Sequence, residues 1–214
     1  MTDAITLETL TGWLHSYADE VHEKAAWLTE LDSAIGDADH GTNMERGTAA
    51  LLAALEQNTP ADVAALFKAV GMAVVSKVGG ASGSLYGTLF LDMAKAAPAT
   101  TTITPEELAT SLRAGISGVI RRGRAEIGDK TMIDALQPAV DALSEALDAG
   151  TSAARALAKA AEAAESGRDA TLPLVARKGR ASYLGERSAD HLDPGAASAA
   201  LLVRTLASAV ETAA

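Results

Sequence analysis

Apolar residues recur at steps of three and four along nearly the whole chain, and this spacing limits the possible folds more than any other feature. Between residues 7 and 31 the repeating positions are Leu7, Leu10, Leu14, Tyr17, Val21, Ala25, Leu28 and Leu31. The same spacing returns over residues 63–74 and 108–120. Positions spaced in this way fall on one face of a helix. The sequence therefore predicts amphipathic helices that share a core.

Alanine-rich stretches and helix-start signals extend the helical pattern to the rest of the chain. Alanine, the strongest helix former, is abundant in three further stretches: 133–148, 152–166 and 195–212. Thr104 is followed by proline and then by Glu107, which is the order of a capping box. The sequences "TPAD" and "DPGA" predict further starts capped by Thr59 and Asp193. No segment alternates apolar and polar residues as a strand does, so we expect an all-α fold of about eight helices.

Length and composition favour a single globular domain over residues 1–214. Hydrophobic residues make up 48% of the chain, which is enough for a sizeable core. The net charge of −10 argues against binding to nucleic acid or to an anionic membrane, because both depend on cationic surfaces. A small anion such as a nucleotide stays possible where a metal and a local basic cluster reverse the field.

The lack of cysteine excludes disulfides, zinc–thiolate sites and cysteine nucleophiles. The start "MTDAITLETL" has neither a basic region nor an apolar run typical of a signal peptide. No apolar run reaches the roughly 18 residues of a membrane-spanning helix. We therefore expect a cytoplasmic protein.

Glycine, serine and charged residues are concentrated in four segments between the plain helices. These segments are Ile35–Asn43, Val78–Gly87, Arg121–Thr131 and Arg177–Gly195. They recur at roughly every second helix, which would place all four at the same end of an up-and-down bundle. Any site that these residues form is therefore expected at that end.

The first segment, within "LDSAIGDADHGTN", brings together Asp32, Asp37 and Asp39. Neighbouring carboxylates repel one another unless a positive charge lies among them, and hard oxygen ligands suit Mg²⁺ or Ca²⁺. The spacing does not fit an EF-hand, whereas three carboxylates are enough for two Mg²⁺ ions held against a polyphosphate. The ordinary alternative is that Asp37 or Asp39 caps a helix that begins near Thr42, and that Asp32 is a solvated charge.

The other segments contain residue types that bind phosphate. "GGASGSLYG", residues 79–87, precedes an apolar helical run, so its backbone N–H groups suit an anion, although such clusters are often plain turns. "RKGRASYLGERS", residues 177–188, is either a phosphate grip or a solvated basic loop. "GDKTMID" fits a helix start capped by Asp129. For His40, a hydrogen bond to phosphate or to a neighbouring aspartate is more plausible than metal ligation.

Four motifs, taken in order, resemble one known family. They are "LDSAIGDADHGTNMERG", "VGGASGSLYGT", "RGRAEIGDKTMIDAL" and "ARKGRASYLGERSADHLDPGA". Together they resemble the nucleotide-binding L subunit of dihydroxyacetone kinase, which is also the C-terminal half of single-chain ATP-dependent dihydroxyacetone kinases. The resemblance covers essentially the whole chain. It implies a closed barrel of eight antiparallel helices with the nucleotide, ADP or ATP, at one mouth.

The resemblance also implies roles for individual residues. Asp32, Asp37 and Asp39 would hold two Mg²⁺ ions that bridge the nucleotide phosphates. Arg180 would supply further charge neutralisation during transfer, so it is the candidate catalytic residue. The residues that match nucleotide contacts of the family are His40, Gly41, Thr42, Asn43, Ala81, Ser82, Gly123, Met132, Arg180, Asp193, Pro194 and Gly195.

The implied activity depends on partner subunits. A phosphohistidine on a partner M subunit would phosphorylate bound ADP, and the γ-phosphoryl group would then pass to dihydroxyacetone on a partner K subunit. One alternative is a chain that exchanges ADP for free ATP and acts on dihydroxyacetone or another small ketose or polyol. Another is a nucleotide sensor that reports to a transcription regulator. Retention of ADP during dialysis would favour the subunit whose ADP is phosphorylated in place, and rapid exchange would favour the chain that uses free ATP.

Overall fold

The computed structural model describes residues 4–214. The first three residues of "MTDAITLETL", in which we expect no signal peptide, lie outside the described part. The eight α-helices are α1 (Leu7–Ile35), α2 (His40–Gln57), α3 (Val63–Lys77), α4 (Gly80–Ala96), α5 (Pro105–Gly123), α6 (Ile133–Asp148), α7 (Ala153–Ala170) and α8 (Pro194–Ala213). A 3₁₀ helix, η1 (Arg180–Ser188), lies between α7 and α8. Across residues 4–214, no helix combines the length and apolar character needed to cross a bilayer.

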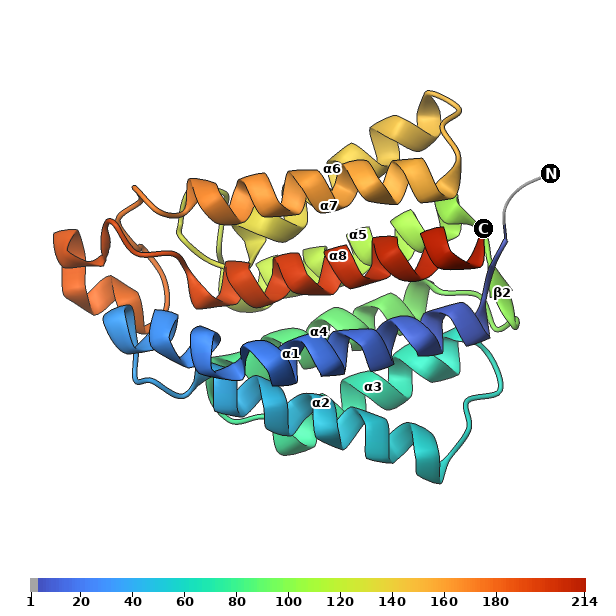
Figure 1. Ribbon diagram of the computed structural model, residues 1–214, viewed down its shortest axis with the longest axis horizontal. Helices are drawn as coiled ribbons and strands as arrows, with labels where there is room; N and C mark the ends of the chain where they lie inside the picture. Colours follow the sequence, from blue (N-terminus) through green and yellow to red (C-terminus); the bar gives the residue numbers. More distant parts are fainter. Residues whose placement is uncertain (1–3) are drawn as a thin grey trace.

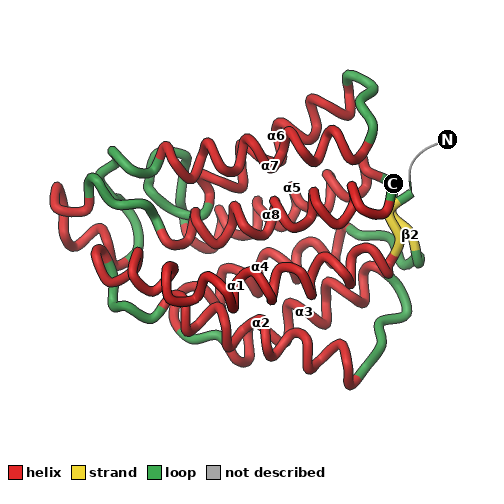
Figure 2. Tube along the Cα trace, viewed as in Figure 1, coloured by secondary structure: helices red, strands yellow, loops and turns green. Residues whose placement is uncertain are grey.

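The eight α-helices form a closed ring, which confirms the all-α prediction. Each helix packs against the next one in the sequence, and α8 packs back against α1. Figures 1 and 2 show the helices running up and down the long axis of the molecule. Four of the connections between helices lie at the end opposite to the C-terminus (Figure 1). The ring therefore brings segments from the whole sequence to one mouth.

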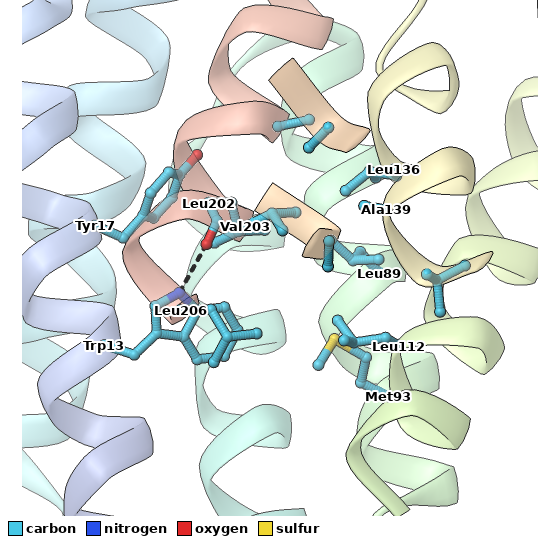
Figure 3. Packing of buried hydrophobic residues seen from close by; sticks show 14 of the residues in the cluster. Trp13, Tyr17, Leu89, Met93, Leu112, Leu136, Ala139, Leu202, Val203 and Leu206 are labelled. Carbon is cyan, nitrogen blue, oxygen red and sulfur yellow. Dashed lines mark hydrogen bonds between the residues drawn. The ribbon is translucent and has the colours of Figure 1, made fainter. Parts of the chain in front are cut away.

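The centre of the ring is filled by aliphatic side chains and a small aromatic group (Figure 3). Trp13 of α1 meets Phe67 of α3 edge-on, with ring centroids 6.4 Å apart and planes at 84°. The indole Nε1 of Trp13 donates a 2.9 Å hydrogen bond to the carbonyl oxygen of Leu202 in α8. Because that donor has a partner, the largest buried side chain carries no unpaired polar atom, and α1 is fixed to α8.

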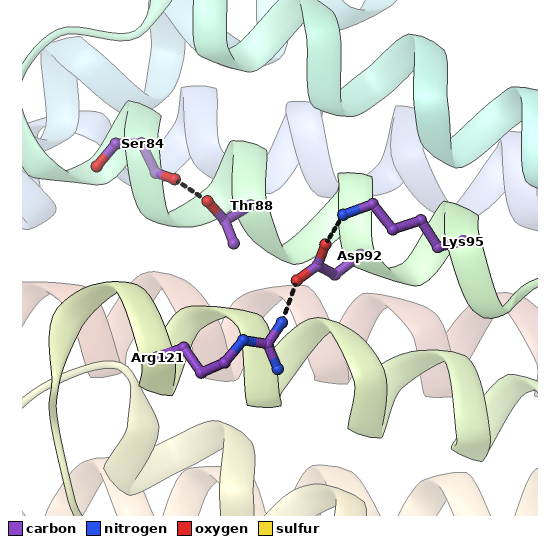
Figure 4. A network of polar contacts seen from close by, with 5 residues as sticks. All are labelled: Ser84, Thr88, Asp92, Lys95 and Arg121. Atoms are coloured by element: carbon purple, nitrogen blue, oxygen red, sulfur yellow. Dashed lines mark hydrogen bonds and ion pairs between the residues drawn. The ribbon is translucent and has the colours of Figure 1, made fainter.

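A polar network on α4 and α5 adds a second link between neighbouring helices (Figure 4). The Asp92 carboxylate lies 2.5 Å from the Lys95 ammonium and 2.8 Å from the Arg121 guanidinium. A Cβ built at Gly118 would lie 2.1 Å from Asp92 Oδ2, so glycine gives the carboxylate room between the helices. Ser84 and Thr88 form a separate 2.7 Å bond along α4.

The helix starts agree in part with the sequence predictions. The capping box at Thr104 is present with both of its hydrogen bonds, and Asp193 caps α8. The predicted cap at Thr59 is wrong: α3 begins at Val63, and Asp62 accepts the cap bond from the Ala65 N–H. A carboxylate at the last position of "TPAD" therefore replaces the threonine hydroxyl at the first.

Two features depart from an arrangement of helices and loops alone. Two-residue strands β1 (Ile5–Thr6) and β2 (Thr102–Ile103) pair antiparallel, with Ile5 opposite Ile103. The expectation of no strand is therefore wrong at this short pair, which ties the start of the described chain to the α4–α5 connection. The glycine-rich stretch after Gly79 is also not a loop, because α4 already begins at Gly80.

Candidate functional site

The four glycine- and charge-rich segments meet around one cavity of about 610 Å³. Its wall includes residues from the α1–α2 connection, the start of α4, the α5–α6 connection and the α7–α8 connection. This result confirms the prediction that the four segments lie at the same end of the bundle. The cavity has the size of sites that hold drug-sized or nucleotide-sized molecules.

Asp32, Asp37 and Asp39 converge at the edge of this cavity. One carboxylate oxygen from each residue lies within 4.8 Å of the corresponding oxygen of the other two. Asp32, on the last turn of α1, accepts hydrogen bonds through Oδ2 from the backbone N–H groups of Asp39 (2.8 Å) and His40 (3.1 Å). A buried carboxylate of α1 thus folds the following loop back over itself.

Small residues shape this loop. A Cβ built at Gly36 would lie 2.0 Å from Asp32 Oδ1, so only glycine leaves that oxygen in place. Between the two exposed aspartates, Ala38 has φ 61° in the left-handed region, which is uncommon for a residue with a Cβ. Across the described chain, all four non-glycine residues with positive φ lie in the mouth connections: Ala38, Arg124, Lys130 and Asp190. Backbone strain of this kind is concentrated at functional sites in proteins.

The three carboxylates fit a divalent cation. Asp37 and Asp39 are exposed, whereas Asp32 is buried, so the set offers oxygen ligands on the solvent side of the cavity. Carboxylates together with substrate phosphates are the usual ligands of Mg²⁺ in proteins. In the structure the Arg180 Nη2 lies 3.0 Å from Asp37 Oδ2 and offsets part of the negative charge. The predicted metal and charge-neutralising residues are therefore neighbours in space.

Two helix starts beside the carboxylates receive no side-chain cap bond from their own N-cap residues. α4 begins after Gly79 without a side-chain cap, and Ala81 and Ser82 in its first turn line the cavity. Asp39 occupies the cap position of α2, but its side chain accepts no cap bond. The alternative that Asp39 serves only as a helix cap is thereby wrong. An anion beside these helix starts would be favoured by the N–H groups and by the helix dipoles.

His40 is buried, and its imidazole joins the cavity to the core. Its Nδ1 lies 3.2 Å from Ser82 Oγ, and its Nε2 lies 2.9 Å from Ser198 Oγ. The Tyr86 hydroxyl lies 2.7 Å from the same Ser198 oxygen. Burial lowers the pKa of His40, which favours the neutral ring. Of the two partners expected for this imidazole, the neighbouring aspartate is replaced by two serines, and the bond to phosphate stays a prediction.

The start of α8 forms another part of the wall. Asp193 Oδ2 accepts a 2.7 Å hydrogen bond from the Ala196 N–H, and Pro194 and Gly195 follow at the cavity surface. Burial raises the pKa of Asp193 to about 7, and the nearby Asp134 charge adds to the increase. This carboxyl is therefore poised to change its charge close to neutral pH.

The remaining predicted nucleotide residues divide into two groups. Asn43, Gly123 and Met132 line the cavity. Gly41 and Thr42 do not line it: Thr42 is exposed on α2, and Gly41 packs against α1, where an added Cβ would lie 1.9 Å from the Ala25 carbonyl oxygen. Their predicted contact with a nucleotide stays a prediction, whereas the packing role of Gly41 follows from the geometry.

Three residues of this region were not singled out from the sequence. Ser198 lies inside a helix whose sequence looks like ordinary core. Tyr86 lies in "GGASGSLYG", where the backbone N–H groups were considered, and Lys130 lies in "GDKTMID", where only Asp129 was considered. Asp129 does not cap a helix; it accepts a 2.9 Å bond from the Glu126 N–H, and α6 begins later, at Ile133. A lone polar residue within an apolar run was the only available signal for Ser198.

Comparison with known proteins places this geometry in a family. A family model described as the DAK2 domain matches residues 34–208. The chain is 46% identical over 194 residues to the "PEP-dependent dihydroxyacetone kinase 1, ADP-binding subunit DhaL" of Listeria innocua, covering 91% of this chain and 92% of that protein. It is 44% identical over 202 residues to the corresponding Escherichia coli ADP-binding subunit, covering 94% and 96%.

Solved structures of a longer enzyme share the fold. The dihydroxyacetone kinase of C. freundii superposes with a TM-score of 0.71 in its native form, at 25% identity over 92% of this chain. Its complex with AMP-PNP and Mg²⁺ gives 0.70 at 26% identity, again over 92% of this chain. The chain spans 33% of that enzyme's length. On the family model and the two close relatives, this chain belongs to the DAK2 domain family, in the group that contains the DhaL subunits.

Proposed function

We propose that the chain is the ADP-binding subunit of a dihydroxyacetone kinase. A phosphohistidine on a partner M subunit phosphorylates ADP in place at the mouth, and dihydroxyacetone held on a partner K subunit receives the γ-phosphoryl group. The Listeria innocua and Escherichia coli relatives, both named as ADP-binding subunits of PEP-dependent dihydroxyacetone kinases, support this assignment.

One observation carries the proposal: three aspartates converge beside an uncapped helix start in a single cavity. Asp32, Asp37 and Asp39 would hold Mg²⁺, and we propose two ions. Bound there, Mg²⁺ supplies positive charge that neutralises phosphate oxygens and orients them for in-line transfer. The C. freundii enzyme with AMP-PNP and Mg²⁺ shares this fold and thereby supports the pairing of nucleotide and metal.

The protein groups have separate tasks around the nucleotide. The first-turn N–H groups of α4, at Ala81 and Ser82, bind phosphate oxygens without adding charge. Arg180 moves from its ion pair with Asp37 toward the phosphates and stabilises the charge that develops on the transferred group. Met132 and Gly123, on the opposite connection, offer an apolar wall for the base.

The chain itself needs no general base in this scheme. Phosphoryl transfer depends on positioning and charge neutralisation more than on covalent protein chemistry, and the acceptor hydroxyl belongs to the K subunit. The one histidine on the cavity wall, His40, is buried and bonded to two serines, so it orients neighbours. We assign it to the placement of Ser82.

A mixing experiment tests the function. The chain is combined with K and M subunits and dihydroxyacetone, with either phosphoenolpyruvate plus the general phosphocarriers or ATP alone. The proposal predicts dihydroxyacetone phosphate only with phosphoenolpyruvate and the carriers, and ADP that stays bound through extensive dialysis. Product from free ATP with rapid nucleotide exchange would contradict it and would favour the ATP-exchanging kinase.

Arg180→Ala tests the catalytic assignment within the same assay. The variant is expected to bind Mg²⁺–ADP roughly tenfold more weakly, because one phosphate contact is lost while the aspartates and the α4 start are intact, and transfer at saturating nucleotide falls by roughly 100-fold, as when other transition-state contacts are removed. Arg187→Ala, also on η1 but outside the cavity wall, is the matched control. Full transfer activity in Arg180→Ala would refute the assignment.

A further inference from the structure

Lys130 is a buried cation surrounded by backbone carbonyl groups. Its side chain is among the largest fully buried ones, with 1% of the residue exposed. Its Nζ donates to the carbonyl oxygens of Thr171 at 2.8 Å and Leu174 at 3.1 Å, lies 3.4 Å from that of Leu172, and also donates to that of His191. A lysine ammonium has three N–H donors, so every donor has a partner inside the protein.

These carbonyl groups come from both ends of the α7–α8 connection. Thr171 follows the last turn of α7, and His191 precedes the cap of α8. Between them lies η1, which carries Arg180. The Asp190 N–H also donates to the Leu172 carbonyl at 2.8 Å, so the two ends are close together. The Lys130 ammonium therefore lies at the neck of a loop whose outer part reaches the cavity.

Lys130 itself belongs to the α5–α6 connection on the other side of the mouth. The same connection makes one further bond to the loop, from the Arg177 N–H to the Asp129 carbonyl at 3.0 Å. Lys130 adopts φ 64°, a left-handed conformation that is unfavourable for a residue with a Cβ. This backbone conformation directs the side chain into a cage formed by the carbonyl oxygens of Thr171, Leu172, Leu174 and His191.

The groups around Lys130 act on its charge in opposite directions. Burial lowers the pKa of Lys130, whereas the negative charges of Asp193, Asp190 and Asp134 act in the opposite direction. Carbonyl oxygens around a buried cation replace the water that it has lost, and without the cation they would be buried acceptors lacking a partner. Loss of the ammonium is therefore expected to loosen first the α7–α8 connection, which supplies those oxygens.

We propose that Lys130 is a positioning residue, whose ammonium ties the neck of the α7–α8 connection to the α5–α6 connection and so holds Arg180 at the nucleotide cavity. The nucleotide part of this inference rests on the proposed function. The tie between the two connections stands on the contacts alone. Lys130 acts on the phosphates indirectly, through the position of the loop that carries Arg180.

Two substitutions test the tie. Lys130→Met removes the charge and keeps the length of the side chain. Lys130→Gly relieves the left-handed backbone and leaves space for n-butylammonium, which has the carbons and the charge of the lost side chain. Lys95→Met is the matched control, because Lys95 pairs with Asp92 at the far end of α4 from the mouth.

Limited trypsin digestion of the nucleotide-free protein gives the first readout. Mass spectrometry is expected to show faster cleavage after Arg177, Lys178 or Arg180 in both Lys130 variants, by about tenfold. Lys95→Met is expected to be cut at the wild-type rate. Addition of n-butylammonium to Lys130→Gly restores protection, and it does nothing for Lys130→Met, whose cage is filled.

Binding of Mg²⁺–ADP gives the second readout. Affinity is expected to fall roughly tenfold in the Lys130 variants and to return with n-butylammonium in Lys130→Gly. Mn²⁺ binding at the aspartates is expected to stay at the wild-type value. If the wild-type chain failed to bind ADP, the proposed function would fall, whereas the digestion experiment would still decide the tie.

Two results would overturn the inference. One is wild-type protection and wild-type affinity in Lys130→Met. The other is general loss of the helical circular dichroism signal in both variants with no recovery on adding n-butylammonium, because the lysine would then support the whole fold. Recovery of loop protection by the amine in a folded Lys130→Gly chain is the result that the proposal requires.

Discussion

At the scale of single residues, Asp39 adds charge to the mouth without adding to the packing. Its side chain is exposed and accepts no cap bond, while its backbone N–H is held by Asp32. Three carboxylates whose oxygens lie within 4.8 Å repel one another when no cation is among them. We therefore expect Asp39 to contribute to metal binding and to cost stability in the metal-free chain.

Asp39→Ala is expected to lose bound ADP while the chain stays helical. Affinity for Mg²⁺–ADP falls at least about tenfold, and the metal-free melting temperature is unchanged or slightly raised because one repelling charge is gone. Circular dichroism and calorimetric titration check the two parts. Asp141→Ala removes an exposed carboxylate that pairs with Arg113 and serves as the control. A variant that keeps wild-type ADP binding would refute the assignment.

Asp193 gives a dependence of stability on pH with a defined sign. Burial raises the pKa of Asp193 from 3.8 to about 7 in the folded chain. Between those pH values the folded chain holds a proton that the unfolded chain releases. The contribution of Asp193 to the free energy of unfolding is therefore favourable at low pH and is lost as pH rises toward 7, by a few kcal/mol at most.

Asp193→Asn is expected to remove this loss, because an amide oxygen still caps α8 and never ionises. Compared with the wild-type chain, the variant gains stability between pH 4.5 and pH 7.5, which urea unfolding without metal or nucleotide measures. Asp62→Asn, at the cap of α3, measures the effect of an asparagine cap by itself. An equal difference between Asp193→Asn and wild type at both pH values would contradict the prediction.

Some residues of the candidate site were predictable from the sequence and others were not, and the difference has a physical reason. Three aspartates within eight positions are recognisable because their mutual repulsion needs a cause. Ser198 and Lys130 give no such local signal. Their hydrogen-bond partners lie 158 and 41 positions away, so their roles exist only once the ring has closed.

At the scale of helices, glycines set how closely α1 and α2 approach beside the aspartates. A Cβ on Gly41 would lie 1.9 Å from the Ala25 carbonyl oxygen and 2.4 Å from Thr29 Oγ1. Gly12, on the same α1, has no neighbouring atom within 4 Å of an added Cβ. The two positions therefore respond to the same substitution in opposite directions.

Gly41→Ala is expected to destabilise the chain by about 1–3 kcal/mol, because the helices must separate to admit the methyl group. Gly12→Ala is expected to stabilise it by about 0.5–1 kcal/mol through helix propensity. Urea unfolding of both variants checks the signs. Equal effects at the two positions would show that the α1–α2 contact is looser than in the structure. The start of α2 also shifts in Gly41→Ala, so ADP affinity falls only in that variant.

Helix boundaries were predictable where the cap was local and unambiguous. Thr104 with Glu107 satisfies both cap bonds within four residues, so its sequence was sufficient. In the "TPAD" segment the predicted cap was Thr59, whereas Asp62 accepts the bond from the Ala65 N–H and α3 begins later, at Val63. In "GGASGSLYG" the glycines suggested a loop, but packing overrides their low helix propensity: Val78 and Val75 occupy the space where Cβ atoms of Gly83 and Gly87 would lie.

At the scale of the whole molecule, the closed ring couples the site to global stability. Every consecutive helix pair is in contact, and α8 closes on α1, so residues of the first and last helices share one mouth. The all-α class and the common end of the four segments followed from periodicity. The closure of the ring came from the family resemblance, since periodicity alone does not distinguish an open bundle from a closed one.

Ligands that bind only this closed state stabilise it. At a concentration a hundredfold above its Kd, Mg²⁺–ADP is expected to add about 2.7 kcal/mol, which raises the melting temperature by roughly 5–10 °C for a chain of this size. Chelation with EDTA reverses the shift. A scan by differential calorimetry with and without EDTA checks it, and Asp39→Ala, whose affinity is at least about tenfold lower, is expected to show at most about half of the wild-type shift. An unchanged melting curve after chelation and nucleotide stripping would count against the account.

The location of the bound cations tests the central claim most directly. Crystals grown with Mn²⁺ and ADP allow the metal to be located by anomalous scattering. We expect anomalous peaks within bonding distance of oxygens from Asp32, Asp37 and Asp39, adjacent to the diphosphate. Crystals with ordered ADP and no metal peak at those carboxylates, or with their oxygens turned into solvent, would contradict it.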